Sequence, residues 1–511
     1  MELTETISKT SQFLQDLPHS FALICFVVIF TSLLTALIAK RKKELRNVGA
    51  FAGPPAHWLL GHVKELKQDG TDFDHLIKWG EQYPLAFPLW FGPFVSFLNI
   101  HHPDYAKTLL TSTGPKDDFA FDFLSPWIGE GLLVSNGQKW SRHRRLLTPG
   151  FHYNVLKPYT KLISDSAKTM LDKWEGYAQT SESFELFEHV SLMTLDSIMK
   201  CAFSCNSDCQ HEGGTNAYIK AVYELTHLTF LRFRTFPYHS DIVFHLSPHG
   251  FRFRKACRVS NGFIVSDPRQ QLDIYAQTQQ DPKGPERFSL MTISFYHLVD
   301  CQDEKQQGLS DEDIRAEVDT FMFEGHDTTA SGISFILYCL ACNPEHQQMC
   351  RDEIIHALEG KDTIEWEDLS KIPYTTMCIK ESLRLYPPVP GILRKTTKPI
   401  TFFDGRTVPA GCWCICSVFG IHRNATVWEN PDVFDPLRFL PENSSNRSPY
   451  AFVPFSAGTR NCIGQTFAMN EMKVVVAQTL RRYQLIEDPT RKPKIIPRLV
   501  LHSLNEEYEK L

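Results

Sequence analysis

The longest uninterrupted run of apolar residues lies near the N-terminus, at residues 21–39. It carries no charge, and its only polar side chains are those of Thr31, Ser32 and Thr35. A helix of about 19 residues is roughly 28 Å long, which is enough to cross a thin bilayer. Four basic residues follow at positions 40–43, and the positive-inside rule places them in the cytosol. The pattern predicts a retained single-pass anchor, and the alternative is a buried core helix.

Beyond the basic residues, short strand-like stretches alternate with longer helical ones. Gly53-Pro54-Pro55 stops any helix, so residues 40–55 are expected to form a basic, proline-rich hinge. Residues 56–511 contain no break in composition and are expected to form one domain. Strands are predicted at 86–91, at 95–100 and within 398–420, and helices at 155–174, 184–203 and 374–387. The pattern therefore predicts a mainly α fold with small β-sheets near the two ends of the body.

The longest predicted helix of the body spans about 33 residues, or about 50 Å, so it crosses the whole body. Ser310 is a suitable N-cap before three acidic residues, and Asn343-Pro344 ends the helix. Glu324, Asp327 and Thr328 are spaced i, i+3 and i+4 and are expected to share one face. Carboxylates in the middle of an apolar helix are rare unless they are paired, bound or used in chemistry.

Composition excludes several classes of protein. The net charge of -6 gives no bulk preference for nucleic acid. Fourteen cysteines are scattered over 511 residues, unlike the dense disulfide framework of a small secreted domain. An iron–sulfur enzyme is an alternative, because cysteines recur at Cys201, Cys205 and Cys209, at Cys339 and Cys342, and at Cys412, Cys414 and Cys416. These spacings do not match the common run of cysteines that binds such clusters.

One cysteine near the C-terminus has a distinctive environment. Gly458 and Gly464 flank Cys462, Arg460 lies two residues before it, and the apolar stretch 467–480 predicts a helix just after it. Backbone N–H groups and the dipole at a helix N-terminus favour a thiolate. Such a thiolate is a metal ligand or a nucleophile, and no His/Asp pattern of a protease accompanies it.

The loop has the pattern Phe-x-x-Gly-x-Arg-x-Cys-x-Gly, formed by Phe455, Gly458, Arg460, Cys462 and Gly464. It resembles the haem-binding loop of the cytochromes P-450. Three further motifs agree with that family: Glu381-Ser-Leu-Arg384 with Arg438, Trp140-x-x-x-Arg144, and the run Glu-Gly-His-Asp-Thr-Thr that begins at Glu324. The resemblance covers nearly all of the chain from residue 40. It is closest to family 4, the fatty-acid ω-hydroxylases, and within it to the 4B-type members.

The resemblance implies how a haem is held. The fold would be the haem-thiolate fold of that family, with an N-terminal transmembrane helix and haem b (iron protoporphyrin IX) as cofactor. Cys462 would be the axial ligand of the haem iron, while Trp140, Arg144 and Arg460 would contact the propionates. Behind the haem, a buried structural network would join Glu381, Arg384 and Arg438.

The resemblance also assigns the chemistry on the long helix. Asp327 and Thr328 would relay protons to bound dioxygen, and the alternative is a helix kink stabilised by the threonine hydroxyl. Glu324 would form an ester with a haem methyl, and the alternative is a carboxyl group that is neutral or bonded to water. Apolar residues at 119–127 and 389–393 are expected to face the substrate.

The expected function is that of a membrane-anchored haem-thiolate monooxygenase that uses O2 and electrons from NADPH. Family likeness implies terminal hydroxylation of fatty acids, with xenobiotics as further substrates. The electron donor would be NADPH–cytochrome P-450 reductase, with cytochrome b5 as a second candidate. Lys139, Arg142 and Arg145 are candidates for the donor's docking face, or else form a solvated surface. Alternatives are a non-enzymatic haem sensor, or a monooxygenase of eicosanoids or of retinoid- or steroid-like lipids.

Location follows from the anchor and from the family. Residues 1–20 would lie in the lumen of the endoplasmic reticulum and residues 21–39 in its membrane, while residues 56–511 would form the cytosolic haem-thiolate domain. One stretch departs from the family. Residues 259–300 hold Pro268, Pro282 and Pro285 where a long charged helix is expected, which reflects either divergence or an error in the sequence.

Overall fold

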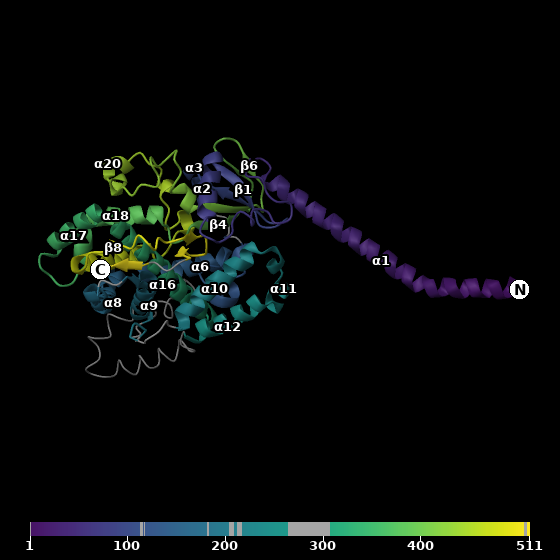
Figure 1. The fold of residues 1–511 in the computed structure, drawn as a ribbon, viewed down its shortest axis with the longest axis horizontal. Helices are drawn as coiled ribbons and strands as arrows, with labels where there is room; N and C mark the ends of the chain where they lie inside the picture. The colour runs from purple at the N-terminus through teal and green to yellow at the C-terminus, as the bar shows by residue number, and fades with distance from the viewer. Residues whose placement is uncertain are drawn as a thin grey trace.

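The computed structural model describes residues 2–112, 116, 118–180, 183–203, 209–211, 217–263, 307–504 and 508–510. Most of the departing stretch, from residue 264 onward, lies outside them. The body consists of helices with several small sheets, and a long helix, α1 (Glu2–Val48), stands away from it (Figure 1). The mainly α fold class predicted from the sequence is confirmed.

Helix α1 contains the one stretch among the described residues that is long and apolar enough to cross a membrane, Leu23–Val48, with a mean hydropathy of 2.4 over its most apolar window. The helix continues through the basic residues to Val48, so only the second half of the expected hinge at 40–55 is non-helical. Arg41 explains why, because its guanidinium lies 3.9 Å from the Trp90 ring and donates to the Pro93 carbonyl at 2.6 Å. The end of α1 is therefore docked on the body.

Four short strands form the largest sheet, in the order β1-β2-β7-β4. Strands β2 and β7 are parallel, and the other two pairings are antiparallel. The strands of the structure are β1 (Ala86–Trp90), β2 (Ser96–Ile100), β3 (Phe184–Glu185), β4 (Gly391–Lys395), β5 (Ile400–Thr401), β6 (Thr407–Val408), β7 (Trp413–Ser417), β8 (Ile486–Glu487), β9 (Ile495–Ile496), β10 (His502–Ser503) and β11 (Tyr508–Lys510). The sheet thus joins the N-terminal strands to a segment some 300 residues later.

The remaining α-helices build the rest of the body. They are α2 (Asp72–Gln82), α3 (Pro103–Leu110), α4 (Asp118–Phe121), α5 (Ser125–Ile128), α6 (Gly137–Leu147), α7 (Tyr153–Leu156), α8 (Tyr159–Thr180), α9 (Leu186–Phe203), α10 (Ala217–Arg234), α11 (Asp241–Leu246), α12 (Pro248–Phe263), α16 (Asp311–Cys342), α17 (Pro344–Leu358), α18 (Pro373–Leu385), α19 (Val418–Ile421), α20 (Pro441–Ser444) and α21 (Gln465–Arg482). Helix α16 is the predicted long helix, and the Ser310 side chain caps it by accepting from the Asp313 N–H.

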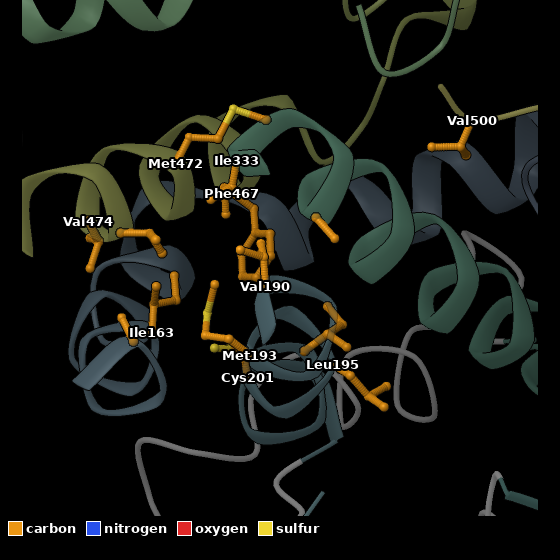
Figure 2. Close-up of a cluster of buried hydrophobic side chains, with 14 of the residues drawn as sticks. Ile163, Val190, Met193, Leu195, Cys201, Ile333, Phe467, Met472, Val474 and Val500 are labelled. Carbon is orange, nitrogen blue, oxygen red and sulfur yellow. The ribbon is translucent and has the colours of Figure 1, made fainter. Parts of the chain in front are cut away.

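The main core lies where α8, α9, α16 and α21 meet. Figure 2 shows Ile163 of α8, Met193 of α9, Ile333 of α16 and Val474 of α21 pointing toward one another. All four side chains are at most 1% exposed. This packing fixes α16 and α21 relative to each other. Helix α16 carries Glu324, and α21 directly follows the loop that contains Cys462.

Two predicted helices differ from the observed ones for identifiable reasons. The helix predicted at 155–174 is divided into α7 and α8 by Pro158, which has no N–H to donate. The helix predicted at 184–203 begins only at Leu186, because Phe184 and Glu185 pair with β11 near the C-terminus. Such a pairing between distant residues has no local signal.

Behind the helix crossing, α18 carries a fully buried ion pair. Arg384 donates to both carboxylate oxygens of Glu381 at 2.8 Å, and the Asp435 N–H donates to the same carboxylate at 2.9 Å. The Nε of Arg438 lies 3.3 Å from Glu381, as the sequence predicted for a structural network. Arg384 also donates to the carbonyls of His422, Pro431 and Val433, so it ties α18 to the segment that precedes the cysteine loop.

We expect Glu381→Gln to lower the free energy of unfolding by about 3–5 kcal/mol, because it leaves the Arg384 charge buried without a counterion. The matched control is Glu224→Gln, which removes one side of the exposed Glu224–Arg252 pair and should cost at most about 1 kcal/mol. Urea unfolding midpoints of the purified proteins provide the measurement. Equal effects of the two substitutions would contradict a structural role for the buried pair.

Candidate functional site

A cavity of about 450 Å³ lies at the centre of the body, enclosed by α6, α10, α16, β4 and the cysteine loop. Six residues singled out from the sequence line it: Trp140, Arg144, Glu324, Thr328, Arg460 and Cys462. The segments 119–127 and 389–393 also contribute to its wall, as predicted. Asp327 and the Glu381 network do not line it. The fold therefore brings three motifs that are far apart in the sequence to one buried space.

Cys462 sits in the loop just before α21. The loop is held by a hydrogen bond from the Cys462 N–H to the Phe455 carbonyl at 2.9 Å, and it turns through Gly458, whose φ is 75°. A side chain at Gly458 would come within 2.2 Å of the Leu110 carbonyl oxygen, so this position requires glycine.

Burial raises the pKa of the Cys462 thiol to about 11, and Glu324 adds to the shift, while the Gly464 N–H, Arg144 and Lys116 oppose it. The Gly464 N–H acts in the direction expected from the sequence, but burial outweighs it. A metal ion bound to sulfur displaces the proton.

Cationic side chains gather at the Cys462 end of the cavity: Lys116, Arg144, Arg394 and Arg460. Arg144 donates to the backbone and side-chain oxygens of Asn461 at 2.8 and 2.9 Å. Arg460 stacks on the Trp140 ring at 4.2 Å and donates to the Ser135 carbonyl at 2.9 Å, and its Nη1 is buried without a partner. Burial and repulsion from Arg394 and Arg144 lower the pKa of Arg460 to about 9. Such a cluster of like charges is costly unless acidic groups bind among them.

The three polar residues of α16 lie within an arc of roughly 100°, but only two of them reach the cavity. Asp327 and Thr328 are at the two edges of this arc, on either side of Glu324. Glu324 and Thr328 line the cavity, and the Thr328 hydroxyl donates to the Glu324 carbonyl at 2.7 Å. Asp327 does not line the cavity, and its carboxylate lies 3.5 Å from Nε2 of His502, the first residue of β10.

The two carboxylates of this helix have opposite electrostatic environments. Burial raises the pKa of Glu324, Lys116 opposes the shift and Glu317 adds to it. Burial also acts to raise the pKa of Asp327, but His502, His326 and Arg498 outweigh it and hold that pKa below its usual range. Glu324 therefore tends to be neutral, whereas Asp327 stays ionised.

The donor set fits a haem. Among the described residues no cluster of three or more His, Cys, Asp or Glu side chains could hold a bare metal ion. A single cysteine suits an iron that already carries the four nitrogen ligands of a porphyrin. The unpartnered Nη1 of Arg460 and the neighbouring cations suit the two propionates. Cys462, Arg144, Arg394, Arg460 and Lys116 are the residues that would hold the group.

Sequence reasoning missed four cavity or site residues: Lys116, Arg394, Arg498 and His502. Arg394 directly follows the segment 389–393 that was expected to face the pocket, so strand alternation could have suggested it. Lys116 and His502 carry no local signal, because only tertiary packing brings them to Glu324 and Asp327. The pKa of Lys116 is lowered by burial and by the arginines to about 7, although Glu324 opposes the shift.

The expected basic face on α6 is partly engaged within the protein. Lys139 forms an ion pair with Asp313 at 2.9 Å, and Arg142 donates to the carbonyls of Gln307 and Gly308 at 2.9 and 2.7 Å. These contacts tie α6 to the start of α16. They leave less free charge for a partner than the sequence suggested.

Comparisons with known proteins agree with this geometry. The family model described as cytochrome P450 matches residues 51–509. Cytochrome P450 4B1 of Rattus norvegicus is 48% identical over 485 residues, which cover 95% of this chain and 94% of the relative. Human cytochrome P450 4B1 is 48% identical, with 92% and 91% coverage. Cytochrome P450 4A6 of Oryctolagus cuniculus is also 48% identical, again with 92% and 91% coverage. These matches exclude the iron–sulfur alternative, whose Cys205 lies outside the described residues.

Proposed function

The chain belongs to the cytochrome P450 family, and from this premise we propose that it hydroxylates the terminal carbon of fatty acids. It is a haem-dependent monooxygenase whose partners are O2, a lipophilic substrate and a redox protein. When bound, the haem supplies the activation of O2 and the insertion of one oxygen atom into a C–H bond. Two observations argue against a non-enzymatic haem sensor. The chain is a member of family 4, and it has a substrate cavity, which a sensor does not need.

The apolar wall of the cavity is the observation that carries the proposal. Its apolar lining includes Phe121, Phe230 and Phe233, together with Phe73 and Leu76 of α2. A lining of this kind binds a flexible hydrocarbon by burial, at roughly 0.8 kcal/mol for each CH₂ group. The charged groups are concentrated around Cys462, where they would pair with the haem propionates rather than with the substrate.

We expect the purified protein, reconstituted with NADPH–cytochrome P450 reductase, to place a single oxygen atom on the terminal carbon of saturated fatty acids. Mass spectrometry of products across a series of chain lengths, with and without cytochrome b5, measures both the reaction and the donor requirement. Oxidation confined to eicosanoids or to retinoid- or steroid-like lipids would overturn the proposal. So would the absence of product from protein with a normal reduced carbon monoxide difference spectrum.

Thr328 and Asp327 are proposed to deliver protons during this reaction. The Thr328 hydroxyl lines the cavity, and the ionised Asp327 carboxylate lies beside it in sequence but faces His502. His502 thus holds the carboxylate in place, and water at its unpartnered oxygen would complete the path. In the assay above, Thr328→Ala should divert electrons from hydroxylated product to hydrogen peroxide. An unchanged product-to-NADPH ratio would exclude the relay.

Glu324 is proposed to form an ester with a haem methyl. A carboxyl buried in this cavity tends to be neutral, and an ester removes its charge permanently. It would also tie the haem to α16.

We expect acid-organic extraction to leave haem on the wild-type protein and to release it fully from Glu324→Ala. Mass spectrometry of the denatured polypeptide after turnover measures the bound haem. Thr328→Ala is the matched control, because it changes the same cavity-facing side of α16 one turn later and should retain haem. Full release from the wild type would exclude the ester.

The protein is proposed to lie on the cytosolic face of the endoplasmic reticulum, anchored once by α1. A second apolar surface supports this orientation. On α11 and at the start of α12, Ile242 is 73%, Leu246 75% and Phe251 61% exposed. Helix α11 lies on the side of the body from which α1 departs (Figure 1). Phe94 connects α1 to the region of α11. Its ring lies 5.6 Å from the ring of Phe236, just before α11, and Lys40 of α1 lies over it.

We expect protein that lacks residues 1–39 to retain weak binding to phosphatidylcholine vesicles, and the substitution of both Ile242 and Leu246 by serine to reduce it at least tenfold. Each buried side chain contributes about 1.5–3 kcal/mol. The control is Ile355→Ser, since Ile355 is 52% exposed on α17 at the opposite side of the body (Figure 1). Vesicle flotation measures binding, and equal loss in both variants would contradict the orientation.

A further inference from the structure

The cavity also contains a cation far from the cysteine, and we propose that this residue, Arg234, binds the carboxylate of the fatty-acid substrate. The inference rests on the proposed function. It adds a specific polar subsite to a cavity that is otherwise apolar outside the Cys462 end.

Arg234 and the cations around Cys462 belong to separate electrostatic groups. Lys116 interacts with Glu324, Arg394, Arg460 and Cys462. Arg234 interacts with none of these, and the one charge that acts on it is Asp72. The geometry of α10 separates them as well. The Tyr223 ring of α10 lies 5.7 Å from the ring of His502, which contacts Asp327. Arg234 ends the same helix about three turns later, roughly 16 Å further along. The two groups nevertheless line the same cavity.

Arg234 lines the cavity, and among the described residues its guanidinium has one hydrogen-bond acceptor. It is the last residue of α10 and donates through Nη2 to the Leu66 carbonyl. A guanidinium has five N–H donors, so four remain. Within 4.0 Å, no ion pair among the described residues involves Arg234. The adjoining walls are Gln68, Phe230 and Phe233, of which Gln68 adds a second polar side chain.

The location matches what a terminal hydroxylase needs from an anchor. Arg234 is half-buried, so a carboxylate bound there keeps part of its hydration and is less costly to bind than at a fully buried site. From this point the apolar wall leads inward to Cys462. A fatty acid held by its carboxylate at Arg234 therefore presents the other end of its chain to the site of oxidation.

A second cavity arginine, Arg498, is a weaker candidate. Its Nε and Nη1 are buried without partners, and its guanidinium lies 4.9 Å from the Tyr223 ring. However, its charge acts on Asp327, whose pKa it helps to lower. Asp327 adjoins Thr328 at the oxidising end of the cavity. A carboxylate bound at Arg498 would lie beside the reaction site and leave no length for the chain.

The test compares acid and neutral ligands of one chain length in the holoenzyme. Dodecanoic acid, methyl dodecanoate and dodecan-1-ol are titrated against the wild type, Arg234→Gln and Arg234→Lys, and the haem absorbance change measures each dissociation constant. We expect Arg234→Gln to weaken binding of the acid about tenfold, the value of one hydrogen bond between charged groups. The ester and the alcohol should be unaffected. Arg234→Lys keeps the charge but loses the paired donors, so its dissociation constant for the acid should lie between those of the wild type and Arg234→Gln.

The readout is the ratio of the dissociation constants of acid and ester in the same variant. A general loss of folded protein affects both constants alike and leaves this ratio unchanged. Arg498→Gln is the matched control and should leave this ratio unchanged. Wild-type protein without any preference for the acid, or loss of the preference in Arg498→Gln instead, overturns the role of Arg234. If no chain compound binds or is oxidised, the proposed function itself fails, whereas equal weakening of acid and ester leaves it intact and rejects only the anchor.

The regiochemistry gives a second readout. With the anchor removed, the chain can slide along the cavity, so we expect Arg234→Gln to convert part of the terminal alcohol from dodecanoic acid into products oxidised at neighbouring carbons. The products from methyl dodecanoate should have the same distribution in the wild type and the variant. An unchanged distribution from the acid would count against the anchor.

Discussion

Helix α16 is the element on which the geometry of the site depends, because its 3.6-residue repeat decides which side chains can reach the cavity. Packing against α9 and α21 leaves it no freedom to rotate (Figure 2). Glu324 and Thr328 are consequently presented to the cavity, and Asp327 is presented to the β9–β10 segment. Helix α16 thus directs Glu324 and Thr328 into the cavity and keeps the ionised Asp327 carboxylate outside it.

Electrostatics then divides the cavity into two regions with different tasks. At the inner end, the thiol of Cys462 and the buried cations are unfavourable by themselves, as the raised pKa of the thiol and the lowered pKa of Arg460 show. A haem would remove both costs, because its iron would bind the thiolate and its two propionates would pair with the cations. At the outer end, Arg234 forms no ion pair among the described residues, although the charge of Asp72 acts on it. The apolar lining of the cavity suits a hydrocarbon chain.

The scaffold behind the site is held by buried polar contacts as well as by apolar packing, and one of them, Glu381–Arg384, is an ion pair. The Glu381 carboxylate accepts from Arg384 and from the Asp435 N–H, and His143 lies 2.6 Å from Glu317 between α6 and α16. Each pair joins an element that bears a site residue to another element. Directional contacts of this kind specify relative positions more sharply than hydrophobic burial does.

Local signals in the sequence determined a large part of this protein. The apolar run at 21–39, the cap at Ser310, the breaker at Asn343-Pro344 and the glycine loop around Cys462 each act through the backbone of a few residues, so they could be interpreted without the fold. Tertiary structure decided the rest. It turned Asp327 to His502, brought Lys116 and Arg394 to the haem end, and placed Arg234 at the other. These positions depend on packing between residues far apart in the chain, and spacing within one helix carries no information about what lies opposite it.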